Sequence, residues 1–135
     1  KKSVPTLAPG DGRKRNWTAI LEHIEVEWLE QDEDCSRNAK DGDTLSFNHK
    51  GFIAELPPGK NTMNGQPIMK GMQFDGNVNP ESKEAIPLEF TLGTPRLVVG
   101  MEAVLRTMCV GEKVRALIPP GLAYNTRKDF LPYGT

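Results

Sequence analysis

Residues 86–119 constrain the fold most, because the spacing of their apolar side chains predicts two strands with a helix between them. IPLEFTL (86–92) and KVRALIP (113–119) are short apolar runs of the kind found in strands. Gly111 is placed to close the helix between them as its C-cap. The apolar side chains that share one face of this helix are those of Leu97, Met101, Val104, Leu105 and Met108.

The remaining segments add strands and one long loop. In HIEVEWL (23–29) apolar and acidic residues alternate, which predicts a half-buried strand. A second alternation, in TLSFNH (44–49), follows a turn at Asp41–Gly42. Residues 56–73 are rich in Pro, Gly and Asn and predict a long surface loop or an irregular edge. The predicted class is α+β, an antiparallel sheet with one short helix packed across it.

Length and charge limit the organisation and the partners. At 135 residues the chain has the size of a single domain, and its net charge of −1 favours neither a nucleic-acid nor a membrane partner. Residues 1–16 are basic and poor in apolar side chains, so we expect a flexible N-terminal arm before one domain over 17–135. No apolar run is long enough to span a membrane.

Motif searches predict neither a metal site nor a cofactor. The two histidines and two cysteines are not at ligand spacing, and no phosphate-binding or dinucleotide motif is present. The cysteines, Cys35 and Cys109, can be buried thiols or can form one disulfide, and the residues alone leave both open. A nucleophilic Cys109 paired with His49 or His23 is disfavoured, since no nucleophile signature surrounds it.

Four stretches of the chain together resemble a known family. They are GDTLSFNHKG, FDGN, PLEFTLGTPRLVVGMEAVLRTMCVGEKVRALIPPGLAY and LPYGT. From about Ile24 to Thr135 the chain resembles the FKBP-type peptidyl-prolyl cis-trans isomerase domain of the macrolide-binding immunophilins. The resemblance implies an FKBP-like antiparallel β-sheet wrapped around one short α-helix. Because the chain stops at Thr135, we expect the family's final strand to be missing from it.

The cysteines resemble those of the secretory-pathway branch of the family in particular. Members of that branch carry one Cys before the GD turn and a second in an MC-x-GEK motif, and the two are paired. The resemblance therefore implies a Cys35–Cys109 disulfide and an oxidising compartment, the endoplasmic reticulum lumen or the cell exterior. It also implies that the sequon Asn16-Trp17-Thr18 carries a glycan on Asn16.

The proline-binding pocket of the family can be transferred residue by residue. Phe74 and Asp75 match the family's Phe–Asp pair, and Leu97 and Val98 match its Val–Ile pair. Tyr124 matches its loop tyrosine.

Four further pocket positions are less regular. His49 stands where a tyrosine is usual, and Leu88 where an aromatic residue is common. Met101 replaces the tryptophan of the pocket floor. Leu131 opens LPYGT, which resembles the family's Ile-Pro-Pro-x-x-Thr segment.

The resemblance implies a peptidyl-prolyl cis-trans isomerase that assists protein folding in the secretory pathway. It would act on proline-containing polypeptides and need no cofactor. Because Met101 is softer than tryptophan, we expect reduced activity and weak macrolide binding. The alternative is a catalytically weak or inactive FKBP-fold module that binds proteins as a chaperone. The 56–73 loop differs most from the family, so a separate protein partner is expected there.

Overall fold

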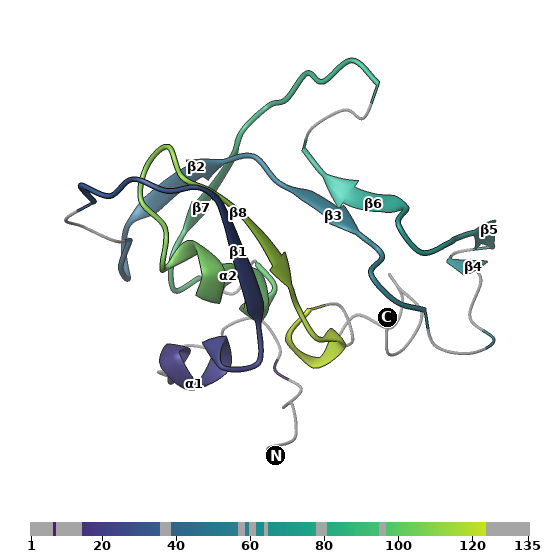
Figure 1. Ribbon diagram of the computed structural model, residues 1–135, viewed down its shortest axis with the longest axis horizontal. Coiled ribbons are helices and arrows are strands. Elements are labelled where there is room, and N and C mark those ends of the chain that lie inside the picture. Colours follow the sequence, from purple (N-terminus) through teal and green to yellow (C-terminus); the bar gives the residue numbers. More distant parts are fainter. Residues whose placement is uncertain are drawn as a thin grey trace.

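The computed structural model describes residues 7, 15–35, 39–56, 59, 62–63, 65–77, 81–94 and 97–123. The elements follow in the order α1, β1 to β7, α2, β8 and a short 3₁₀ helix, η1 (Figure 1). Within the described residues the strands pair two by two, and every pair is antiparallel. The predicted α+β class with antiparallel pairing is therefore confirmed.

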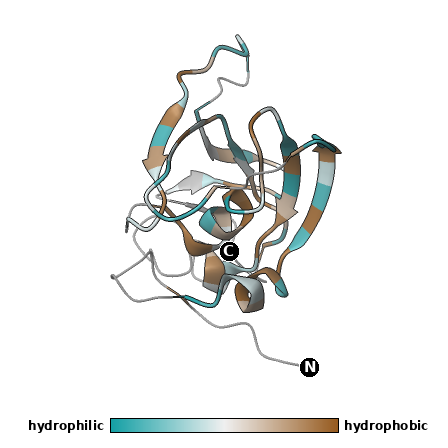
Figure 2. Ribbon diagram, turned by 90° about the vertical axis from the view of Figure 1, so that its left-hand side faces the viewer, coloured by the Kyte–Doolittle hydropathy of each residue, from teal (hydrophilic) through white to brown (hydrophobic). Residues whose placement is uncertain are grey.

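The first strand pair confirms the alternation read from the sequence. β1 (Glu25–Glu30) pairs with β8 (Lys113–Leu117), and exposed and half-buried residues alternate along β8 and the first part of β1. Figure 2 shows hydrophilic and hydrophobic residues alternating along the strands. This pattern arises because successive side chains of a strand point to opposite faces, so that one face packs while the other meets water.

Two further antiparallel pairs are formed by β2, β3, β6 and β7. β2 (Thr44–Phe47) pairs with β7 (Leu88–Thr91), and β3 (Lys50–Phe52) pairs with β6 (Gln73–Gly76). Figure 1 shows β2 passing into β3, and β3 and β6 extending away from the two helices. Three of the nine pocket residues that the resemblance implies lie on these strands: Phe74, Asp75 and Leu88.

The predicted loop over 56–73 contains regular structure that the sequence did not indicate. β4 (Thr62–Met63) and β5 (Gln66–Pro67) pair as a short antiparallel ladder, and β6 begins at Gln73. The prediction of a long surface loop or irregular edge did not include this short ladder or the start of β6. Gly65, between the two strands, has φ +79°, a left-handed conformation that glycine adopts without strain.

The helix between β7 and β8 is shorter than predicted. α2 spans Val99–Leu105, and its C-cap is Arg106. Gly111 is not the C-cap; it has φ +87° in the turn that leads to β8. The helix ends early because the N–H groups of Thr107 and Met108 bond to carbonyls three residues back, which tightens the last turn.

A second helix was not predicted. α1 (Trp17–Leu21) begins at Asn16, whose side-chain oxygen accepts the Ala19 N–H at 3.1 Å. Asparagine is among the best N-caps because it satisfies a helix-end donor that would otherwise have no partner. The strand predicted over 23–29 follows this helix as β1.

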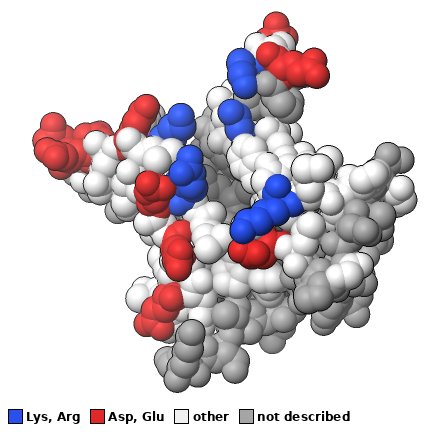
Figure 3. Space-filling view, turned by 45° about the vertical axis from the view of Figure 1, so that its right-hand side comes forward, with Lys and Arg blue, Asp and Glu red and all other residues white. Residues whose placement is uncertain are grey.

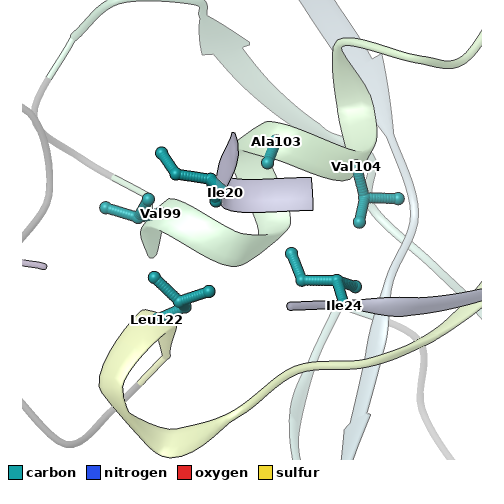
Figure 4. Packing of buried hydrophobic residues seen from close by; sticks show 6 residues of the cluster. All are labelled: Ile20, Ile24, Val99, Ala103, Val104 and Leu122. Atoms are coloured by element: carbon teal, nitrogen blue, oxygen red, sulfur yellow. The ribbon is translucent and has the colours of Figure 1, made fainter. Parts of the chain in front are cut away.

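The hydrophobic core lies between α1, α2, β1, β8 and η1 (Pro120–Leu122). Its buried residues, drawn in Figure 4, are Ile20, Ile24, Val99, Ala103, Val104 and Leu122. Leu7 packs against this cluster and donates its N–H to the Gly121 carbonyl at 2.7 Å. The other residues of 1–14 lie outside the described residues, so the flexible arm stays a prediction.

A disulfide joins the end of the β1 segment to the turn after α2. Cys35 and Cys109 are bonded across 74 residues, with Cα atoms 6.1 Å apart, so the implied pairing is confirmed. The Glu112 carboxylate joins the same two segments, accepting the Cys109 N–H at 2.6 Å and the Asp32 N–H at 2.9 Å. The closed loop holds β1 to the helix end.

Candidate functional site

The start of α2 carries three of the implied pocket residues. Val98 is the N-cap in an extended conformation (φ −61°, ψ 142°), and its carbonyl accepts the Glu102 N–H at 3.1 Å. Val98 is buried, whereas Leu97 and Met101 are half-buried. The helix thus begins with a mainly apolar surface that is partly open to water.

Arg106 and Glu102 hold α2 in place. The Arg106 guanidinium donates to Glu102 at 2.8 Å and to Asp41, and it lies over the Trp17 ring, 4.2 Å from the centroid. The buried Glu102 carboxylate also accepts the Gly93 N–H at 3.0 Å. Burial lowers the pKa of Arg106, but hydrogen bonds and charges from Glu102 and Asp41 raise that pKa overall. The guanidinium therefore stays charged and fixes α2 to α1 and to the ends of β2 and β7.

A β-bulge places Phe74. The pairing passes from Gly51 with Asp75 to Phe52 with Gln73, so Phe74 is the extra residue of β6. Bulges re-aim side chains and are common beside binding sites. Phe74 is half-buried, and the side chain of Asp75 lies outside the described residues.

His49 and Leu88 come together through the β2–β7 ladder. Phe47 lies opposite Leu88, and the Phe47 and His49 rings are 5.8 Å apart, tilted by 50°. His49 is half-buried, while the Leu88 side chain is 39% exposed. The ladder therefore brings both residues to the end of β2 where the chain enters β3.

Two implied pocket residues cannot be placed. Tyr124 and Leu131 lie outside the described residues, as does the segment that would decide whether a final strand is missing. The chain reaches Tyr124 from η1, which packs closely on α2. A Cβ atom at Gly100 would overlap the Ile118 side chain and lie 3.0 Å from the Leu122 carbonyl oxygen. Glycine at this position lets the two segments approach.

Asn77 is a residue of this region to which the sequence analysis gave no role. Its backbone N–H donates to the His49 carbonyl at 3.2 Å, and its side chain joins several strand ends. The neighbouring Gly76 has φ +142°, and a Cβ atom there would lie 2.7 Å from the His49 carbonyl oxygen. A Gly-Asn pair, which is typical of turns, is the sequence signal that could have found it.

The surface around these strands has mixed charge. The face in Figure 3 is hollowed near its centre, with both basic and acidic side chains around the hollow. The mixed charge around the hollow is compatible with a polypeptide ligand that carries no particular net charge.

Among the described residues, no group of three or more His, Cys, Asp or Glu side chains is arranged to hold a metal ion. Nor do the described helices include one with the length and hydropathy of a membrane span.

Comparison with known families agrees with this arrangement. The sequence model of the FKBP-type peptidyl-prolyl cis-trans isomerase family matches residues 35–131. The chain belongs to this family. The matched range begins at Cys35, so α1 and β1 precede it, and it includes every FKBP pocket residue named above.

Individual relatives carry the same family names. The chain is 29% identical to peptidyl-prolyl cis-trans isomerase FKBP7 of Homo sapiens over 103 residues, 76% of this chain and 39% of that protein. It is 34% identical to FK506-binding protein 2 of Yarrowia lipolytica over 92 residues, 68% of this chain and 51% of that protein. With peptidyl-prolyl cis-trans isomerase FKBP11 of Bos taurus the identity is 33% over 105 residues, 77% and 42% of the two chains. The chain thus spans about half or less of these FKBP relatives.

Proposed function

We propose that the protein is a peptidyl-prolyl cis-trans isomerase that acts on proline-containing polypeptides. The observation that carries the proposal is the family match over residues 35–131, which takes in all of the implied pocket residues. The described part of the pocket supports it, because Leu97, Val98 and Met101 form a mainly apolar start to α2. Such a surface suits a proline ring.

The proposed mechanism needs neither a nucleophile nor a metal. Amide resonance gives the X–Pro bond a rotation barrier of about 20 kcal/mol, and the planar amide separates more charge than the twisted one. A dry apolar pocket therefore favours the twisted transition state. In this scheme the Val98 N–H and the Tyr124 hydroxyl donate to the carbonyls beside proline, and Asp75 orients the pocket edge.

We propose that turnover and macrolide affinity are both reduced. Met101 is flexible and half-buried at the position where the family has a rigid aromatic floor, and Leu88 is partly exposed where an aromatic residue is common. A softer floor holds the proline ring less firmly. Met101→Trp should raise kcat/KM for a proline peptide by roughly tenfold, which corresponds to about 1.4 kcal/mol. A Met101→Trp variant that folds without any gain would contradict this explanation.

The second candidate function is a binding or chaperone module with little turnover. It is favoured by the large apolar side chains of Phe52, Met69 and Met72, which are exposed on β3 and just before β6. Exposed apolar side chains on a hairpin can hold unfolded polypeptide. A separate partner at residues 56–73 belongs to this alternative.

An oxidising, secretory compartment is part of the proposal. The Cys35–Cys109 disulfide supports it, because such bonds persist outside reducing compartments. Asn16 is exposed, and its Oδ1 atom accepts the cap hydrogen bond, which leaves Nδ2 as the atom for a glycan. Folding assistance to secreted clients would follow from this location.

The test is NMR exchange spectroscopy on a short Ala-Leu-Pro-Phe peptide, with and without the folded, oxidised protein. Faster cis–trans exchange that a macrolide abolishes is the expected result. Unchanged exchange from protein with a dispersed amide spectrum would rule out the isomerase. Retention of an unfolded proline-containing polypeptide by that same sample would then support the binding module.

A further inference from the structure

The side chain of Asn77 joins three separate segments. Its Oδ1 accepts the His49 N–H at 2.6 Å. Its Nδ2 donates to the Ile86 carbonyl at 2.8 Å and to Asn48 Oδ1 at 2.9 Å, with the Phe47 carbonyl at 3.4 Å. The amide orientation is fixed by these partners, since a peptide N–H can only donate and a carbonyl can only accept.

His49 is held by Asn77 at both of its backbone groups. The His49 N–H donates to the side chain of Asn77, and the His49 carbonyl accepts the backbone N–H of Asn77 at 3.2 Å. Gly76 makes this possible, because any Cβ atom there would lie 2.7 Å from the His49 carbonyl oxygen. The junction between β2 and β3 is therefore fixed from the end of β6.

Each of the three segments that Asn77 joins, its own included, carries an implied pocket residue. His49 is contacted directly, Leu88 follows Ile86 by two residues, and Asp75 precedes Asn77 by two residues. At this edge the side chain of Ile86 is 84% exposed and that of Leu88 is 39% exposed, although Phe90 further along β7 is buried. Where the β2–β7 and β3–β6 ladders end, the hydrogen bonds of the half-buried Asn77 amide add to the ladders in setting the spacing.

We propose that Asn77 is a positioning residue for the proline-binding pocket. It sets the relative placement of His49, Asp75 and Leu88 and has no role in touching the substrate. The predicted effect of Asn77 on catalysis rests on the proposed isomerase function. The predicted placement of three strand ends by one amide can be tested without substrate, from NMR signals of the residues at those ends.

Two variants separate the contacts. Asn77→Ala removes both the acceptor for His49 and the donor for Ile86. Asn77→Asp keeps an oxygen for the His49 N–H but sets a second oxygen against the Ile86 carbonyl, which can only accept. We expect kcat/KM for the proline peptide to fall roughly tenfold in Asn77→Ala, because small displacements of positioning groups are costly. In Asn77→Asp the Leu88 methyl NMR signals should move more than those of the His49 ring.

Two controls separate positioning from general loss of stability. Asn48→Ala removes an exposed partner of the same amide and leaves the backbone contacts, so activity within about twofold of wild type is expected. Ile24→Val lowers Tm through the distant core and should leave kcat/KM and the Leu88 signals unchanged. An Asn77→Ala protein that is folded at the assay temperature, with wild-type activity and unmoved His49 and Leu88 signals, would overturn the proposal.

The failure of the isomerase proposal can be told apart from failure of this one. If the wild-type protein does not accelerate exchange, the proposed function is wrong. The His49 and Leu88 signals of the Asn77 variants then decide the positioning role alone. Shifts confined to those two residues and their neighbours support the role, and their absence overturns it.

Discussion

The two sides of the molecule are held together by different interactions. On the helical side, formed by α1, α2, β1, β8 and η1, apolar side chains are buried against one another, and the Leu122 side chain has no exposed surface. On the hairpin side, formed by β2, β3, β6 and β7, Phe90 is buried, but large apolar side chains such as Phe52 and Leu88 are exposed. Here backbone ladders and the Asn77 amide connect the segments.

This difference separates stability from function. Burial of apolar surface contributes about 25 cal/mol per Å², so the buried cluster of the helical side contributes directly to the folding free energy. Hydrogen bonds contribute only about 1 kcal/mol each, but they fix direction and distance. The hairpin side can therefore lose a contact without unfolding and still misplace the pocket. Predictions follow from this contrast.

The largest expected effect is the loss of the disulfide. In the chain-entropy model, closing a loop of 74 residues stabilises the fold by about 4 kcal/mol. The double variant Cys35→Ser, Cys109→Ser should lose that amount in denaturant unfolding, while the Leu88 methyl signals of the folded protein stay in place. An unfolding midpoint equal to that of the oxidised wild type would show that the helical side needs no cross-link.

A matched pair of leucines tests the contrast directly. Leu122→Ala leaves a cavity in a fully buried site and should cost about 3 kcal/mol of unfolding free energy. Leu88→Ala, at a partly exposed site, should cost about 1 kcal/mol or less but lower kcat/KM more than Leu122→Ala does. Equal losses of stability in the two variants would remove the distinction between the sides.

Gly100 lies where α2 and η1, two elements of the helical side, pack against each other. Gly100→Ala introduces a Cβ atom that meets Ile118 and the Leu122 carbonyl, so α2 and η1 must separate, at a cost of about 2 kcal/mol. Because η1 leads to Tyr124, isomerase activity should fall beyond what the unfolded fraction explains. Thermal unfolding and the peptide exchange assay on one sample measure both. A loss of activity that merely follows the folded fraction would contradict this link between packing and activity.

The sequence predicts the strands β1, β2, β7 and β8, but it predicts neither β3 to β6 nor the contacts that support the pocket. Alternation in residues 23–29 and 44–49 reflects a period of two that β1 and β2 retain in the fold. α1 escapes detection because five residues give too little periodicity, and its contacts with Arg106 and the core come from distant residues.

The pocket residues were predicted from the family resemblance, and their supports lie far from them in sequence. The bulge at Phe74 depends on the register between β3 and β6, which no local pattern specifies. The bond between His49 and Asn77 spans 28 residues, so periodicity within a window of the sequence carries no signal for it. A tertiary hydrogen bond of this kind becomes visible only when the strand ends are placed in space.

The smallest predicted effect concerns the helical side at its edge, where the N-cap and the sequon share Asn16. Asn16→Ala removes the acceptor for the Ala19 N–H and should cost about 1 kcal/mol of unfolding free energy. Thr18→Ala destroys the same sequon but keeps the cap, so its unfolding free energy should stay within about 0.5 kcal/mol of wild type. When the proteins are expressed in a secreting host, a glycan on the wild type should appear as a shift in gel mobility, and both variants should lack that shift. If the unglycosylated Thr18→Ala protein is destabilised as much as Asn16→Ala, the side-chain cap is not what holds α1. If the wild-type protein shows no shift, the glycan proposal is wrong while the cap prediction stands.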